Sequence, residues 1–235
     1  RIGQEVLLLN DTDLAALISH NWPDDFERLR IELPPWTLVL VISGLIRRPE
    51  EKIAYEENFL TDVIKNEFSD LRLGENLPGF PGLRKKMIDI LRKPWPKDVP
   101  YWKNRVKGAC QNLFFHTRPN MVSRFIDIVE DIAAQYGYPI DDIGMYIQPI
   151  EHNRAARPEF SFFYNPDNEA EAEVIAELYK DAAKVLLSEG AVFTRPYGDL
   201  APIVYDKAAS YASALKRLKK TFDPKNIMNP GNLCF

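Results

Sequence analysis

The second half of the sequence alternates short apolar runs with two long amphipathic runs, in an order that few folds accommodate. Apolar residues that alternate with a period of two predict strands, and those that recur every three or four residues predict helices. The expected elements are a strand at 111–116, a helix at 121–136, strands at 143–151 and 159–164, a helix at 169–188 and a strand at 191–194. This is the element order of the ferredoxin-like split βαβ unit. We therefore expect an α+β fold, with an antiparallel sheet, helices on one face and the other face free to cover something else.

Turn-forming residues support the limits of both helices. Asn120 is a candidate cap for the first, and residues 166–168 open the second. Gly137 and Gly190 stand where glycine commonly ends a helix. The side chains expected to face the core are Val122, Phe125, Ile126, Val129, Ile132 and Ala133 on the first helix, and Val174, Ile175, Leu178, Val185 and Leu186 on the second.

The first half has a weaker pattern, compatible with a degenerate copy of the same unit. Residues 1–33 are expected to form a lead-in with a helix at 14–20, capped by residues 11–13. The most apolar run, 36–46, predicts a buried strand at 37–43, and Pro49 suits the first turn of the next helix. Further elements are a short strand at 71–73 and a helix at 83–92, inside a proline-rich segment that suits a lid or an oligomer contact. The core stripe expected on the helix that begins at Pro49 is Ile53, Leu60, Val63, Ile64 and Phe68.

Composition excludes several classes of protein. The formal net charge of −4 provides no basic field, which argues against a nucleic-acid partner. The apolar run at 36–46 is about half of the ~20 residues that a membrane-spanning helix needs. Cys110 and Cys234 are too few and too far apart for a disulfide framework, and this usage is compatible with a reducing cytoplasm. The three histidines have no metal-ligand spacing, so no metal site is expected.

The C-terminal stretch combines a helix with two turns. A helix is expected at 206–220, ended by Asp223-Pro224, and Asn229-Pro230-Gly231 makes a second turn. Apolar residues between the turns predict that the segment packs against a surface. We divide the chain into a lead-in at 1–33, a ferredoxin-like domain at 34–205, and a C-terminal helix and tail at 206–235.

This stretch, with the sequence FDPKNIMNPG at 222–231, resembles the C-terminus of the FAD-linked oxidases of the vanillyl-alcohol oxidase / p-cresol methylhydroxylase type. The resemblance implies that the chain is the cap, or substrate, domain of such an enzyme. It also implies that FAD is held mainly by an FAD-binding domain or subunit that this sequence does not contain, and that the tail packs toward the flavin site.

Residues 144–163 contain the strongest group of candidate site residues. Alternation along the first strand sets Tyr146 and Gln148 on one face, and Glu151 and His152 follow in the connecting loop. A solvated loop whose charges pair with one another is an equally good interpretation of the residues alone. In the family that the sequence resembles, the corresponding strands form the wall of the substrate pocket. The resemblance therefore makes Tyr146 a catalytic candidate and the other three substrate-binding candidates.

A second candidate group follows the last expected strand. Phe193, a further substrate-binding candidate, precedes Arg195 and Tyr197. An arginine can hold a carboxylate or phenolate through two hydrogen bonds. The alternative is a turn with a surface ion pair between Arg195 and Asp199. The resemblance implies catalytic roles for Arg195 and Tyr197, because a Tyr-Arg pair close to this place binds the phenolate in the vanillyl-alcohol oxidase branch.

A third group concerns the cofactor. Asn112 matches the position at which some relatives carry a histidine joined covalently to FAD, and asparagine cannot make that bond, so the resemblance implies non-covalent binding. His116 lies on the same strand face as Asn112 and is either a flavin contact or an ordinary half-buried histidine. Arg118 and Asn229 complete the cofactor-binding candidates.

The resulting hypothesis is the cap portion of an FAD-dependent oxidoreductase that oxidises an alcohol, hydroxy acid or phenol by hydride transfer to flavin. We expect a cytoplasmic homo-oligomer with a small-molecule substrate and no membrane partner. The alternative is a non-catalytic ferredoxin-like binding or assembly module.

Overall fold

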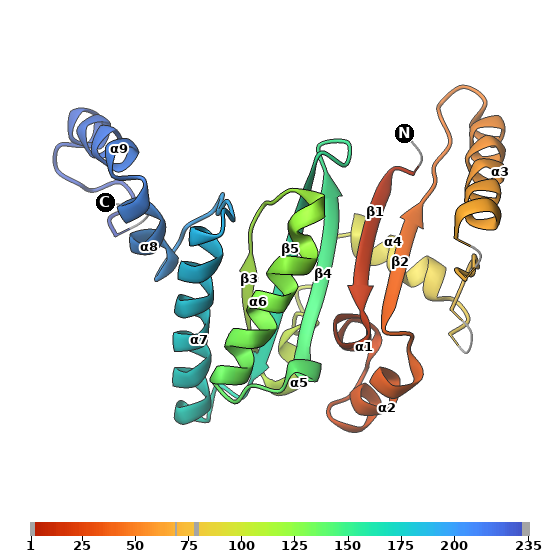
Figure 1. Cartoon of the computed structure of the whole chain (residues 1–235), viewed down its shortest axis with the longest axis horizontal. Helices are drawn as coiled ribbons and strands as arrows, with labels where there is room; N and C mark the ends of the chain where they lie inside the picture. Colours follow the sequence, from red (N-terminus) through yellow and green to blue (C-terminus); the bar gives the residue numbers. More distant parts are fainter. Residues whose placement is uncertain (1–2, 69, 78–79, 232–235) are drawn as a thin grey trace.

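A five-stranded antiparallel sheet runs through the computed structural model, which describes residues 3–68, 70–77 and 80–231 (Figure 1). Its strands are β1 (Glu5–Asn10), β2 (Trp36–Val41), β3 (Ala109–Phe114), β4 (Ile143–Ile150) and β5 (Ala155–Tyr164). They lie in the order β2-β1-β4-β5-β3, and every neighbouring pair is antiparallel. The α+β class and the antiparallel sheet expected from the sequence are confirmed.

The ferredoxin-like unit occupies the β4-β5-β3 side of the sheet. The strand β3 leads through the short helix η1 (Pro119–Met121) into α6 (Val122–Gln135), and β5 is followed by α7 (Glu169–Ser188). Asn168 caps α7 by accepting a hydrogen bond from the backbone N–H of Glu171 at 3.3 Å. Asn120 does not cap α6 as expected, because it lies inside η1, and Met121 precedes α6 without a side-chain cap. The strand expected at 191–194 is only a single bridge, between Val192 and His116.

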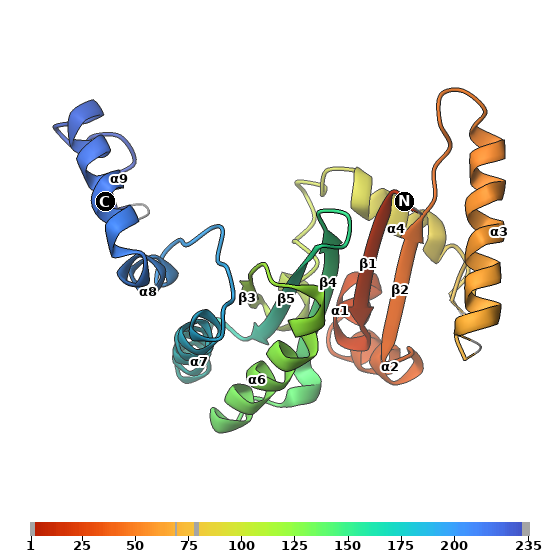
Figure 2. The ribbon, with the colours of Figure 1, turned by 45° about the horizontal axis from the view of Figure 1, so that its top comes forward.

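The helices α6 and α7 cover one face of the sheet (Figures 1 and 2). On α7 the inward residues are Ile175, Leu178, Ala182, Ala183 and Leu186, which follow the helical repeat. Val174 and Val185 were also expected inside, but each is 39% exposed because it lies at the border of this stripe. The main core comprises these residues together with Leu113, Phe115, Phe125, Val129, Ile132, Ala133, Tyr138, Ile143, Met145, Phe160, Phe162, Ala191, Phe193 and Leu200.

A second core lies on the opposite face, because neighbouring residues of a strand point to opposite sides. Phe162 belongs to the main core and Phe163 to the second one. Four helices pack there: α1 (Asp11–Ile18), α2 (Asp24–Glu32), α4 (Leu83–Arg92) and α5 (Asn104–Lys107). Helices therefore pack on both faces of the sheet, and not on one face only as the sequence predicted. They leave the polar side chains of β3, β4 and β5 on this face half-buried.

The strand β1 was not predicted from the sequence. Its last residue, Asn10, connects three elements: its side-chain Oδ1 accepts hydrogen bonds from the backbone N–H groups of Asp13 and Met145, at 2.9 and 2.8 Å. Its Nδ2 donates to the carbonyl of Ile143 at 2.8 Å. Asn10 rather than residues 11–13 is therefore the cap of α1, and it ties α1 to β4.

Several residues in the first half of the chain are more exposed than the sequence predicted. The strand β2 is at the edge of the sheet, and its Leu38 is 53% exposed. The helix α3 (Pro49–Glu67) lies beyond that edge (Figure 1), so its expected core stripe is half-buried at Ile53, Leu60, Val63 and Ile64, and Phe68 is exposed. Residues 71–73 form no strand in the described part of the chain.

The C-terminal helix expected at 206–220 is divided into α8 (Leu200–Lys207) and α9 (Ala209–Phe222), which meet at Ala208. Both lie beyond α7, away from the sheet (Figures 1 and 2). Within the ranges that the structure describes, no helix combines the length and apolarity that crossing a membrane requires. Cys234 lies outside the described residues.

Candidate functional site

Polar and aromatic side chains of three strands share the partly uncovered face of the sheet. The strand register pairs Tyr146 with Glu159, Gln148 with Arg157, and Phe114 with Glu159. Paired residues of antiparallel strands point to the same side, and this side is opposite the main core that contains Met145 and Phe160. We call the set Asn112, Phe114, Tyr146, Gln148, Arg157 and Glu159 the polar face. All six side chains are half-buried.

His116 extends the polar face beyond the end of β3. The backbone N–H groups of Phe115 and Thr117 donate to the carbonyls of Pro158 and Ala156, at 3.3 and 2.9 Å. This register sets His116 opposite Arg157. Burial and the Arg157 charge lower the pKa of His116, so its imidazole is neutral at neutral pH.

A buried ammonium group lies at one end of the polar face. Lys103, at the start of α5, is 3% exposed, and its Nζ donates to Asn112 Oδ1 at 2.7 Å, Glu159 Oε1 at 2.8 Å and Ser161 Oγ at 2.6 Å. Burial acts against its charge, but the carboxylates of Asp13 and Glu159 outweigh burial and raise the pKa of Lys103. All three protons of the ammonium group are therefore used, which fixes the positions of its partners.

The carboxylate of Asp13 lies next to this ammonium group and is fully buried. Neither of its oxygens has a hydrogen-bond partner of ordinary length among the described residues. Burial raises the pKa of Asp13, while the charge of Lys103 and the hydroxyl of Ser161 lower it in part. Asp13 Oδ1 fits against the backbone of Gly144, where an added Cβ would lie 2.2 Å from it. The glycine is thus required by the close approach of the carboxylate.

Glu159 connects the buried Lys103 to an arginine at the surface. Its second oxygen, Oε2, accepts a hydrogen bond from Arg157 Nη2 at 2.8 Å. The Arg157 guanidinium also stacks on Phe114, with 4.6 Å between Cζ and the ring centroid, and its side chain remains 32% exposed. A carboxylate on one side and an aromatic ring below hold the guanidinium in one orientation. The polar face therefore presents a positioned cation to the outside.

Tyr146 can act on this face as a hydrogen-bond donor. Burial raises the pKa of Tyr146 to about 12, although Arg157 acts in the opposite direction. Its phenol keeps the proton at neutral pH. It is thus suited to donating a hydrogen bond and not to acting as a phenolate base.

The structure brings together four of the residues predicted from the sequence: Asn112, His116, Tyr146 and Gln148. Glu151 and His152 instead lie in the exposed β4–β5 turn, with φ angles of 51° and 57°. Glu151 lies 3.9 Å from Arg154 there, as in the solvated-loop interpretation.

The remaining predicted residues lie away from the polar face. Phe193 is in the main core, with its ring 5.7 Å from that of Phe115. Arg195 and Tyr197 are exposed in the segment that leads to α8, and Asp199 pairs with Lys180 at 3.5 Å rather than with Arg195. Arg118 and Asn229 are also exposed.

The sequence did not predict that Lys103, Asp13 and Glu159 organise the site. It also did not predict the role of Arg157. For Arg157 and Glu159 a signal existed, because charged residues two apart in a strand share a face. For Lys103 no signal existed, since its partners are far from it in sequence.

The tail after α9 is folded back on its own helix. The carboxylate of Asp223 accepts hydrogen bonds from the backbone N–H groups of Ile227 and Met228, at 3.0 and 2.8 Å, and pairs with Lys219 at 2.6 Å. Lys219 and these backbone bonds lower the pKa of Asp223 from its ordinary value of 3.8 to about 2.

This gives the tail turn a defined pH dependence. A carboxyl group whose pKa is lowered by folding stabilises the folded structure at pH values above its pKa in the unfolded chain. This contribution is lost as the pH falls through the lowered pKa of the folded state. We expect the amide resonances of Ile227 and Met228 to shift together as the pH falls from 4 to 2, because the carboxylate of Asp223 becomes protonated near its pKa of about 2. In Asp223→Asn those resonances should already differ at neutral pH and show no such transition. A turn that titrates at the ordinary value of 3.8 would contradict these contacts.

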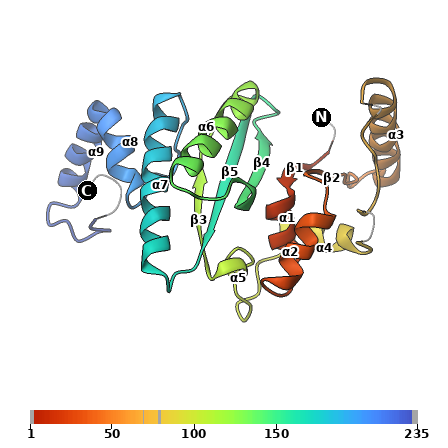
Figure 3. The same cartoon turned by 60° about the horizontal axis from the view of Figure 1, so that its bottom comes forward.

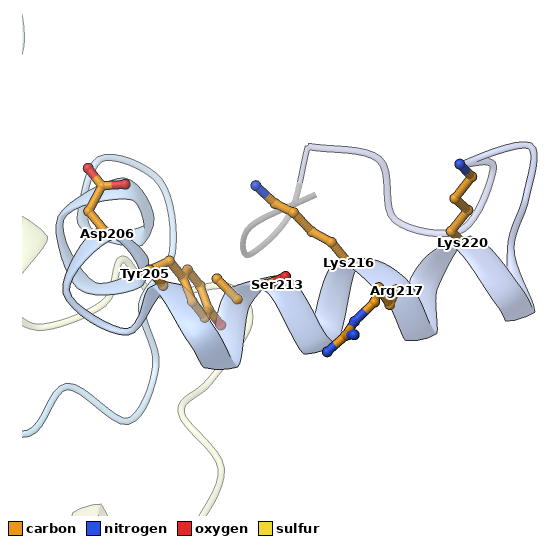
Figure 4. A pocket seen from close by; sticks show the side chains of 8 residues that line it. Tyr205, Asp206, Ser213, Lys216, Arg217 and Lys220 are labelled. Carbon is orange, nitrogen blue, oxygen red and sulfur yellow. The ribbon is translucent and has the colours of Figure 1, made fainter.

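A shallow pocket of about 430 Å³ lies along α8 and α9. Tyr205 and Asp206 line it together with Ser213, Lys216, Arg217 and Lys220 (Figure 4). The cations do not converge, because Lys216 and Lys220 point to one side of α9 and Arg217 to the other. The polar face is therefore the better candidate site.

A family model matches the C-terminal part of the chain. Residues 204–233 match the family model described as FAD linked oxidases, C-terminal domain. No curated protein has a significant sequence match to the chain.

A solved structure has a similar fold. The 4-ethylphenol oxidase of Gulosibacter chungangensis, in complex with isoeugenol, matches with a TM-score of 0.69 and 15% sequence identity, over 97% of this chain and 46% of that chain. The chain thus spans less than half the length of that enzyme. An alkyldihydroxyacetonephosphate synthase matches more weakly, with a TM-score of 0.46 and 11% identity, over 97% of this chain and 39% of that one.

Proposed function

We propose that the chain is the substrate-binding cap of an FAD-dependent oxidoreductase. Two findings support this: residues 204–233 match the model of the FAD-linked oxidase C-terminal domain, and the chain is similar in fold to 4-ethylphenol oxidase. The observation that carries this proposal is the polar face. It is a half-buried sheet surface with a fixed cation, on the side of the sheet that α6 and α7 do not cover.

The donors of the polar face suit a planar polar ring and a small substrate. Gln148 and Arg157 offer N–H groups, Tyr146 offers O–H, and Phe114 adds an aromatic surface. FAD, when bound, supplies the hydride acceptor, and we propose that a domain or subunit outside this chain holds most of it. The chain's own residues would bind and orient the substrate and keep water from it.

Asn112 is central to how the flavin would be held. Its side-chain Oδ1 accepts from Lys103, so its Nδ2 is left to donate outward. An amide cannot form the covalent link that a histidine makes, and we therefore propose non-covalent binding. His116, with a neutral imidazole, is proposed as a second polar contact.

Arg157 is the residue we propose to hold an oxygen of the substrate, an alcohol, hydroxy acid or phenol. The structurally similar 4-ethylphenol oxidase acts on a phenol, as its name states. Arg195, Tyr197 and Asn229 remain proposed contacts through the segment after α7. Because these three residues are exposed in this chain, they are accessible for contacts with a second domain.

The test is the flavin itself. The product of the complete coding region, including any FAD-binding part, should be yellow when purified. Its flavin should be bleached when an oxidisable phenol or hydroxy acid is added without oxygen. A complete product that is colourless, and that gains no flavin when FAD is added, would favour the alternative of a non-catalytic ferredoxin-like module.

A further inference from the structure

A groove with an apolar lining lies beside the C-terminal end of α1, separate from the polar face. Its volume is about 560 Å³, and it runs between α1, α4 and the segment 93–99. Leu17, Ile90, Trp95 and Val99 supply its apolar lining. We call it the α4 groove. Figure 3 shows α1 and α4 on the same side of the molecule.

The charges that line the α4 groove are predominantly positive. Lys85, Lys86, Lys93 and Arg105 all border it, and its one acidic lining residue is Asp89. Asp89 pairs with Lys93 at 2.9 Å. Three cations therefore share a groove in which the described lining residues offer them no free carboxylate.

Two of these cations, Lys86 and Arg105, are half-buried in the groove, and the charge of Arg105 acts on Lys86. Lys86 Nζ donates to the carbonyl of Ile18 at 3.0 Å, and Arg105 Nη2 to that of Leu17 at 3.5 Å. Burial lowers the pKa of both side chains, and the charge of Arg105 lowers that of Lys86 further. Two like charges without an anion between them disfavour each other.

The end of α1 accounts for part of this arrangement, since cations are favourable at a helix C-terminus. It does not account for Arg105 Nε, which is buried without a hydrogen-bond partner among the described residues. Nor does it explain why the guanidinium lies over Trp95, with 5.6 Å between Cζ and the ring. The charge of the nearby Asp25 raises the pKa of Lys86 in part, although the Asp25 oxygens are bonded to the His20 N–H and to Arg28.

We propose that the α4 groove binds an amphiphilic organic anion, with its apolar body against Trp95 and Ile90 and its anionic head between Lys86 and Arg105. An anion there would offset the repulsion between the two cations. A flat aromatic or short aliphatic body suits the lining. This site is independent of the proposed flavin chemistry.

Naphthalene-2-sulfonate is a suitable probe, with 2-naphthalenemethanol as a neutral ligand of the same apolar body. Calorimetric titration of the full chain should show binding of the sulfonate at least tenfold tighter than that of the alcohol. Lys86→Met should weaken sulfonate binding about tenfold or more, because a charge-assisted hydrogen bond contributes about 1.5–3 kcal/mol. It should leave binding of the alcohol unchanged.

Lys85 lies on the exposed rim of the groove, so Lys85→Met should weaken sulfonate binding less than Lys86→Met does and should not disturb the core. Lys65→Met, an exposed lysine in the last turn of α3, is the matched control and should have no effect. Equal affinity for the sulfonate and the alcohol would overturn the proposal. So would an equal loss in Lys65→Met and Lys86→Met when both variants are folded by circular dichroism. Neither result depends on whether the complete protein binds FAD.

Discussion

Replacing Lys103 with methionine is expected to lower the free energy of unfolding by about 3–5 kcal/mol, because one partner of a buried ion pair is removed. Methionine fills a similar volume but supplies none of the three hydrogen bonds to Asn112, Glu159 and Ser161. The loss also leaves the carboxylate of Asp13 buried without its nearest cation. Urea unfolding of the full chain, followed by circular dichroism, measures this effect.

Two controls separate this mechanism from a general effect of losing a lysine. Lys65→Met removes an exposed charge and should change the free energy of unfolding by less than about 0.5 kcal/mol. The double variant Lys103→Met/Glu159→Gln should lose less than the sum of the two single variants, because each single change leaves the other charge unpaired. Additive losses, or a loss below about 1 kcal/mol for Lys103→Met, would show that the network does not stabilise the fold.

The second large effect is expected at Gly144. The Cβ of Gly144→Ala would lie 2.2 Å from Asp13 Oδ1, a separation that real Cβ atoms essentially never show, and 3.0 Å from Ser161 Cβ, which is tighter than most native contacts. Asp13 is fully buried and cannot move toward solvent, so β4 and α1 must separate. We expect a loss of about 3 kcal/mol, at the upper end for overpacking in a core.

Removal of the carboxylate tests whether this contact is the cause. Asp13→Ala/Gly144→Ala should be less destabilised than the sum of its two single variants, since the alanine at 13 makes room for the new methyl group. The midpoints of thermal unfolding for the four proteins of this cycle provide the measurement. If the double variant shows the full additive loss, the close approach of Asp13 is not what requires the glycine.

Much of the ferredoxin-like half could be predicted because its local signals agree with the final structure. The limits of α7 were predicted to the residue, since Asn168 and Gly190 mark its ends and its repeat is regular. The strand β1 could not be found in this way. Its apolar run, 6–9, continues into α1 with no glycine or proline between them, and periodicity does not separate a strand from a helix in such a run.

The candidate site was predictable only where residues of one strand determine it. Alternation placed Tyr146 with Gln148, and Asn112 with His116, and the strand register then joined the two pairs. The burial of Lys103 depends on Asp13 and Glu159, which come from α1 and β5, so no local pattern could reveal it. The positions of Arg195 and Tyr197 depend on the course of the chain after α7. The sequence predicted a strand at 191–194 there, where the structure has only a single bridge.

The central claim is that the polar face lies over the reacting part of a bound flavin and its substrate. It is tested most directly by Arg157→Gln in the product of the complete coding region, with Arg124→Gln on α6, on the opposite side of the sheet, as the control. The account predicts that kcat/KM falls about a hundredfold in Arg157→Gln, at unchanged flavin content and thermal midpoint, and stays unchanged in Arg124→Gln. Full activity in Arg157→Gln, or an equal loss in both variants, would contradict it.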